Sequence, residues 1–118
     1  MKFFIIAGAI NGFLSVALGA FGAHLLEGRV ADKYLATWET AVQYQMFHAL
    51  ALVAVGILMS SKLLGPVSQL NVAGYLILAG IVIFSGSLYV LSLTGISILG
   101  AITPIGGVAF LIGWVMLI

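Results

Sequence analysis

Cysteine is absent from this sequence, and charged residues are scarce. Without cysteine the chain has no disulfide and no thiolate ligand for a metal. Only 6% of its residues are charged, four Lys or Arg and three Asp or Glu, which cannot cover the surface of a soluble domain. The net charge of +1 gives no signal for nucleic acid, and we predict no such partner. A chain that is 64% hydrophobic with so little charge is predicted to lie in a membrane.

Four apolar runs are long enough to cross a bilayer as helices, which takes about 20 residues each. The sequence therefore predicts an all-α membrane protein, with residues 1–118 forming one transmembrane domain whose spans cover about residues 3–26, 42–64, 70–93 and 99–118. Gly65-Pro66 predicts a tight turn between the second and third spans. Lys2 and the first run resemble a secretory signal peptide, but the run exceeds the usual apolar core and three more follow it. We predict that it is retained.

The segment between the first two runs is amphipathic. Val30, Tyr34 and Trp38 recur at steps of four residues, with charged side chains on the opposite face. This pattern predicts a helix of about residues 29–40 lying at the membrane interface, anchored by its aromatic rings. No Gly or Pro separates it from the second run, so one continuous helix that bends or projects near Ala41 is the alternative.

Thr103-Pro104 falls inside the fourth apolar run. A helix beginning at Thr103 would leave too few residues for a span, so we expect a kinked helix that begins nearer Leu99. The carbonyl of Gly100, freed by the proline, then needs a hydrogen-bond donor such as Thr103.

Small residues recur along the spans at helical spacing. In lipid, where hydrophobicity does not drive helices together, such stripes allow the close backbone approach that packing requires. We predict helix-packing positions at Gly8, Gly12, Ser15, Gly19, Gly22, Gly80, Gly106 and Gly113. Packing within the bundle is the preferred interpretation, because a four-helix bundle must first bury such stripes internally. A homo-oligomer contact is the alternative.

Polar side chains are concentrated near the start of the second span. Tyr44 and His48 are four residues apart with Gln45 adjacent, so we expect this face to point into the bundle. His24 and Glu39 are expected at the same end of the bundle. Asn11, in the middle of the first span, is expected to form a hydrogen bond to another helix. The predicted polar cluster therefore comprises Asn11, His24, Glu39, Tyr44, Gln45 and His48.

Three interpretations of this cluster are open. It is a hydrogen-bonded network that fixes helix packing, a pathway for protons or a small solute, or a metal or haem site. Two histidines without a short-spaced ligand motif are a minimal donor set, so we predict no metal and no cofactor. No nucleophile with a base at plausible spacing and no phosphate-binding glycine loop is present, so we predict no enzyme activity.

Four spans would place both termini on one side of the membrane. That side carries Lys2 and Lys62, and the other side carries Arg29 and Lys33, so the basic residues are balanced. We predict cytoplasmic termini, with dual insertion as the alternative.

Four sequence motifs run through the chain, namely GAFGAHLL, WETAVQYQMFHALAL, FSGSLYVLSLTG and LGAITPIGG. Together they resemble the YwdK/YgdD-like family, small bacterial membrane proteins of unknown function that are similar to a small eukaryotic transmembrane protein. The resemblance implies four spans in the bacterial inner membrane and implies no activity, substrate or site residue.

We therefore expect an uncharacterised integral membrane protein that acts as a structural or accessory component through lipid or other membrane proteins. A small proton-linked or solute transporter or channel, using the polar cluster around His48, is the alternative. The first span offers Asn11 instead of the carboxylate on which small multidrug exporters depend.

Overall fold

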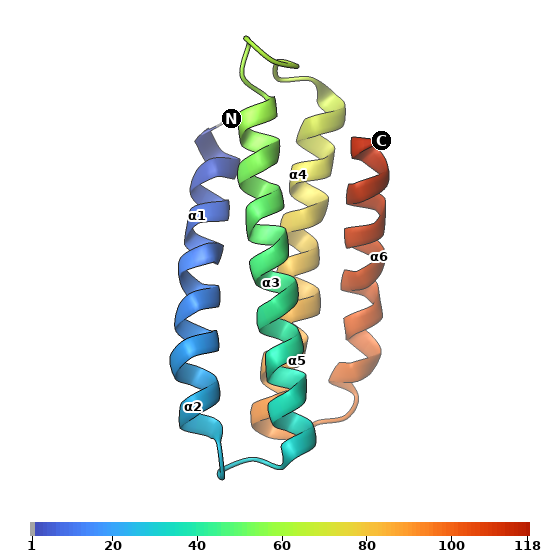
Figure 1. Cartoon of the computed structure of the whole chain (residues 1–118). Coiled ribbons are helices and arrows are strands. Elements are labelled where there is room, and N and C mark those ends of the chain that lie inside the picture. Colours follow the sequence, from blue (N-terminus) through green and yellow to red (C-terminus); the bar gives the residue numbers. More distant parts are fainter. Residues whose placement is uncertain (1) are drawn as a thin grey trace.

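Four long helical segments make up nearly the whole chain, as Figure 1 shows. The computed structural model describes residues 2–118, without the side chain of Ala23. The first segment is α1 (Lys2–Ala17), the π-helix η1 (Leu18–Gly22) and α2 (Ala23–Leu26), and the second is α3 (Asp32–Leu58). The third is α4 (Ser68–Gly80), the π-helix η2 (Ile81–Ser85) and α5 (Gly86–Thr94), and the fourth is α6 (Leu99–Leu117).

The predicted fold class is confirmed. Each of the four segments is long and apolar enough to cross a membrane, and their bounds are Lys2–Leu26, Asp32–Leu58, Ser68–Thr94 and Leu99–Leu117. The first, third and fourth agree within two residues with the predicted spans 3–26, 70–93 and 99–118. The fourth helix begins at Leu99 and continues through Pro104, as expected, but Thr103 donates its hydroxyl to the Leu99 carbonyl instead of the Gly100 carbonyl.

The second segment differs from the prediction. Helix α3 runs without a break from Asp32 to Leu58, so the alternative of one continuous helix is observed in place of a separate interfacial helix over about residues 29–40. The reason is that its apolar face packs on other helices: Trp38 is 6% exposed and Ala41 is 0% exposed. The helix also ends at Leu58 instead of residue 64, because the Ser60 carbonyl accepts the N–H groups of Leu63 and Gly65 and closes a turn.

Helix α3 is the centre of the bundle. It packs along α1 on one side and against α4, η2 and α5 on the other, and α6 packs against α4, η2 and α5 in turn. Figure 1 shows α1 and α6 at opposite edges. The apolar core between these helices includes Phe4, Leu52, Val55, Ile77 and Phe110. With 27 residues, α3 is about 40 Å long, which exceeds a hydrocarbon core of about 30 Å, so it tilts or projects at its ends.

The small residues of the first segment mostly face α3. A Cβ built at Gly8 would lie 2.6 Å from Cγ2 of Val53, and one at Gly19 would lie 2.9 Å from Cγ1 of Val42. Ser15 is fully buried. Gly12 is different, because a Cβ there would meet no atom within 4 Å. This stripe therefore packs within the bundle, with Gly12 outside the contact.

The third and fourth segments approach each other over glycine as well. A Cβ at Gly113 would lie 2.9 Å from Cγ1 of Ile77, and one at Gly106 would collide with the backbone of Phe84. A Cβ at Gly80 would collide with the ring of Phe110. These glycines bring α6 close enough to α4 and η2 for ring-to-backbone contact.

Candidate functional site

A chain of hydrogen bonds crosses the interior of the bundle and joins three helices. The Tyr89 hydroxyl on α5 donates to Oε1 of Gln45 on α3 at 2.7 Å. Nε2 of Gln45 donates to Oδ1 of Asn11 on α1 at 3.0 Å, and Nδ2 of Asn11 donates to the Ala7 carbonyl at 2.9 Å. Gln45 is only 5% exposed, so its amide is supplied with partners entirely by the protein.

Both π-helical segments lie where α3 forms a hydrogen bond to a neighbour. Nε1 of Trp38 donates at 2.9 Å to the carbonyl of Leu18, the first residue of η1. The hydroxyl of Ser85, the last residue of η2, donates at 2.9 Å to the Ala41 carbonyl. A π-helical turn interrupts the α-helical pattern of backbone hydrogen bonds, and at η1 the Leu18 carbonyl accepts the additional bond from Trp38. The Trp38 ring also packs edge-on against Tyr89 at 4.7 Å and so joins this contact to the interior network.

His48 is held in one protonation state by its two neighbours. Nε1 of Trp114 donates to Nε2 of His48 at 3.0 Å, so Nε2 carries no proton. Nδ1 of His48 lies 2.8 Å from the Tyr44 carbonyl oxygen and therefore carries the single proton that it donates. This geometry requires a neutral imidazole, and it ties α6 to α3.

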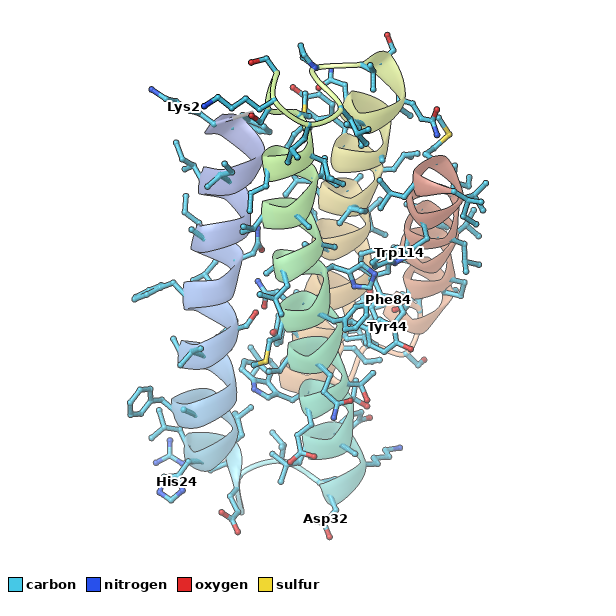
Figure 2. The ribbon with its side chains drawn as sticks, turned by 45° about the horizontal axis from the view of Figure 1, so that its top comes forward. Lys2, His24, Asp32, Tyr44, Phe84 and Trp114 are labelled. Carbon is cyan, nitrogen blue, oxygen red and sulfur yellow. The ribbon has the colours of Figure 1, made fainter. Side chains whose placement is uncertain are left out.

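Aromatic rings surround His48 between α3 and α6. The imidazole stacks on Phe110 with centroids 3.6 Å apart and planes 13° apart, and Tyr44 is nearly parallel to it at 12°. Phe47 and Trp114 meet its edges. Figure 2 shows Tyr44, Phe84 and Trp114 gathered between the two helices. The result is a layer of roughly parallel rings in which His48 and Phe110 are buried and Tyr44 is exposed.

Two adjoining hollows follow this aromatic layer, and we call them together the α3–α6 groove. One has a volume of about 330 Å³ and is lined by Gln43, Tyr44, Phe47 and His48. The other has a volume of about 430 Å³ and is lined by Tyr44, His48, Phe84, Pro104, Gly107, Val108, Phe110, Leu111 and Trp114. Tyr44 and His48 line both hollows.

The structure does not bring all the predicted cluster residues together. Asn11 and Gln45 meet in the interior, whereas Tyr44 and His48 face the groove. The expectation that His24 and Glu39 join them needs correction. His24 is exposed on α2, where Figure 2 shows it pointing away from the bundle. Glu39 is exposed on α3, because the helix turns that face outward while it buries Trp38.

Several residues of the site were missed from the sequence. Trp114 lies in an apolar run without nearby polar side chains, so the sequence gave no signal for it. Ser85 and Tyr89 are four residues apart and Ser92 follows three residues later, a helical spacing that was the available signal for a polar face on the third span. Gln43 has an exposed side chain two positions before Gln45 and was visible as a polar residue inside a predicted span. That position in a span was the available signal. Within residues 2–118, no three His, Asp or Glu side chains gather closely enough to hold a metal ion.

Comparison with known proteins gives relatives over the full length of the chain. A family model described as "Protein of unknown function (DUF423)" matches residues 18–107. The chain is 62% identical over 118 residues to the UPF0382 membrane protein YwdK of Bacillus subtilis (strain 168), covering 100% of this chain and 94% of that protein. It is 55% identical over 118 residues to the UPF0382 membrane protein SAB0533 of Staphylococcus aureus (strain bovine RF122 / ET3-1), covering 100% and 93%. No solved structure matches the chain.

Proposed function

The chain belongs to the DUF423 family of proteins of unknown function, also called UPF0382, and from this premise we propose that it is a non-enzymatic accessory component of the bacterial inner membrane. It acts through contacts that the outer face of the bundle makes with lipid or with another membrane protein. Lipid contact follows from its being a membrane protein with four candidate spans. The finer role rests on the distribution of its polar groups.

The interior polar groups support a structural role because they are bonded to one another. Asn11, Gln45 and Tyr89 form one continuous chain of hydrogen bonds. A transport pathway needs polar groups that face water or a solute along the bundle. None of five hollows of about 230–430 Å³ among residues 2–118 is lined by these three residues. The polar interior is therefore better suited to packing than to conduction.

The observation that carries the proposal is a pair of polar side chains on the outer face of α3. Gln43 is exposed and Tyr44 is 43% exposed, although both belong to a candidate membrane span. Among residues 2–118, neither the Gln43 amide nor the Tyr44 hydroxyl has a hydrogen-bond partner. Leaving such a group unpaired in an apolar medium costs about 1–3 kcal/mol by mutational measures. A component outside the chain that pairs them would recover this free energy.

Site-specific photo-crosslinking in living cells tests the proposal. A photoreactive amino acid replaces Phe47 in the groove or, as a matched control, Val72, which is exposed on α4. We expect a defined adduct, lipid or protein, at position 47 that is absent at position 72. Indistinguishable adducts at the two positions would contradict an accessory role through this face. Proton or solute flux into proteoliposomes that His48→Ala abolishes would instead establish the transporter alternative.

A further inference from the structure

We propose that the α3–α6 groove binds a neutral lipophilic molecule with a flat ring and carbonyl acceptors, the chemical class of the isoprenoid quinones. The inference rests on the proposed function, because it names the component that the outer face of α3 recognises. Four features of the groove support it: the depth of its polar groups, their hydrogen-bonding character, the orientation of its rings and its concave shape.

Depth excludes ordinary phospholipid as the partner of these polar groups. Gln43 and Tyr44 are the twelfth and thirteenth of the 27 residues of α3, so they lie near its middle. At 1.5 Å per residue they are about 17–18 Å from the first residue of α3 and about 21–23 Å from the last, inside the hydrocarbon core. Phospholipid head groups stay at the membrane surface, and acyl chains neither donate nor accept hydrogen bonds. The ligand must therefore carry polar atoms into the hydrocarbon.

The polar groups that face the groove call for an uncharged acceptor. The Tyr44 hydroxyl and the Gln43 amide are free to donate, and a ring carbonyl can accept from either. His48 is already engaged at both nitrogens, by Trp114 and by the Tyr44 carbonyl, so it offers no charge to pair with an anion. Among residues 2–118, no Lys or Arg lines either hollow, so an anion there would lack a counter-charge, whereas a ring with carbonyl groups needs none.

The walls of the groove favour a flat ring. Tyr44, His48 and Phe110 form a layer in which Tyr44 and Phe110 differ by only 24° in plane. Phe47 and Trp114 stand at steeper angles to it, with Phe47 tilted by 49° relative to Trp114. A flat ring can lie parallel to the layer and meet the other rings with its edge, both of which are favourable aromatic geometries.

The concave shape of the groove suits a small molecule. The hollows of about 330 Å³ and about 430 Å³ fall in the size range of small-molecule sites. A ring with the first units of an isoprenoid tail would fill the groove.

Competitive photolabelling of the purified full-length protein in lipid nanodiscs tests the inference. The probe is a naphthoquinone with an isoprenoid tail that carries a diazirine. We expect labelling within residues 43–48 and 107–114, lost when unlabelled quinone is added and retained when an isoprenoid alcohol without the ring is added. Labelling spread over all lipid-facing residues, or equal competition by the alcohol, would overturn the inference.

Substitutions of the two donors test the inference quantitatively. Combining Gln43→Leu with Tyr44→Phe removes both donors and is expected to raise the quinone concentration for half-competition about tenfold, equivalent to about 1.4 kcal/mol. Tyr75→Phe removes an exposed tyrosine hydroxyl from α4 and is expected to leave it unchanged. Unfolding midpoints establish that each variant is folded. Equal competition in all three proteins would refute recognition by Gln43 and Tyr44.

The outcome also separates this inference from the function on which it rests. An adduct with a membrane protein at position 47 in cells, without quinone-specific labelling in nanodiscs, would overturn the quinone assignment and keep the accessory role. Absence of any position-specific adduct in cells would count against the accessory role itself.

Discussion

Replacing Gln45 by leucine tests the interior hydrogen-bond chain most directly. Gln45 accepts from Tyr89 and donates to Asn11, so its amide joins α5 to α1 through α3. Leucine has a similar volume and leaves little cavity, so packing is largely preserved. The substitution therefore removes two interhelical hydrogen bonds and leaves the Tyr89 hydroxyl and the Asn11 carbonyl without these partners.

The expected loss follows from measured values for membrane proteins. Interhelical hydrogen bonds in a bilayer contribute about 0.6 kcal/mol on average and up to about 1.7 kcal/mol. Two such bonds at Gln45 therefore give an expected loss of about 1–3 kcal/mol in the free energy of unfolding. The upper part of this range applies because Gln45 is only 5% exposed and its former partners remain in an apolar interior.

Unfolding in mixed micelles with a rising fraction of denaturing detergent provides the assay. Tryptophan fluorescence reports on it, because Trp38 packs edge-on against Tyr89. Gln43→Leu is the matched control: it changes the same residue type on the same helix, two positions away, where the side chain is exposed. The control is expected to be as stable as the unmodified protein or more stable, since it removes an unpaired amide.

Comparison of Gln45→Leu with Gln43→Leu tests whether the interior hydrogen bonds stabilise the bundle. If Gln45→Leu and Gln43→Leu unfold at the same detergent fraction, the interior bonds contribute nothing to stability and the packing role fails. A double-mutant cycle with Asn11→Leu then isolates the pair, with an expected coupling of about 0.6–1.7 kcal/mol.

Three further predictions use related measurements. Gly106→Ala is expected to lower the free energy of unfolding by about 1–3 kcal/mol, because the new Cβ would collide with the η2 backbone. Gly12→Ala is expected to raise it, because Gly12 has open space around it and alanine favours the helix. Unfolding in mixed micelles measures both variants, and equal effects would contradict the packing argument. Ser85→Ala is expected to lower the free energy of unfolding by about 1 kcal/mol, because it removes the interhelical hydrogen bond to the Ala41 carbonyl. Ser92→Ala removes a hydrogen bond within its own helix and is expected to lower the free energy of unfolding by less. Reporter fusions at both termini are expected to give cytoplasmic signals, and a periplasmic signal from either would refute that orientation.

The span boundaries show how far local sequence information extends. The third span was predicted over 70–93 and observed over Ser68–Thr94, because apolar length is a local property. The prediction failed over 29–40, where the Trp38 face could have met either a membrane surface or another helix. Hydropathy is the same in both cases, and only the neighbour, here the Leu18 carbonyl and the Tyr89 ring, distinguishes them. The resemblance to a family of small bacterial membrane proteins is confirmed by full-length relatives.

The site was only partly accessible from sequence. Asn11 and Gln45 could be named as interhelical hydrogen-bonding residues because polar side chains in a span need partners. Their pairing with each other and with Tyr89 could not be predicted, because Asn11 and Gln45 are 34 positions apart in the chain and Gln45 and Tyr89 are 44 positions apart. His24 and Glu39 could be assigned to one end of the bundle, but their outward direction depended on how α2 and α3 are rotated.

By itself, the sequence determined the membrane environment, the number of spans and the glycines over which helices approach, because composition and helical period are local properties. Only the tertiary structure decided which polar residues meet, that Trp114 holds His48, and that a groove opens between α3 and α6. The physical reason is rotation. Successive residues of an α-helix are turned by about 100° from one another, so Gln43, Tyr44 and Gln45 point in three directions. Packing of α3 against its neighbours places Gln45 in the core and leaves Gln43 and Tyr44 facing the bilayer.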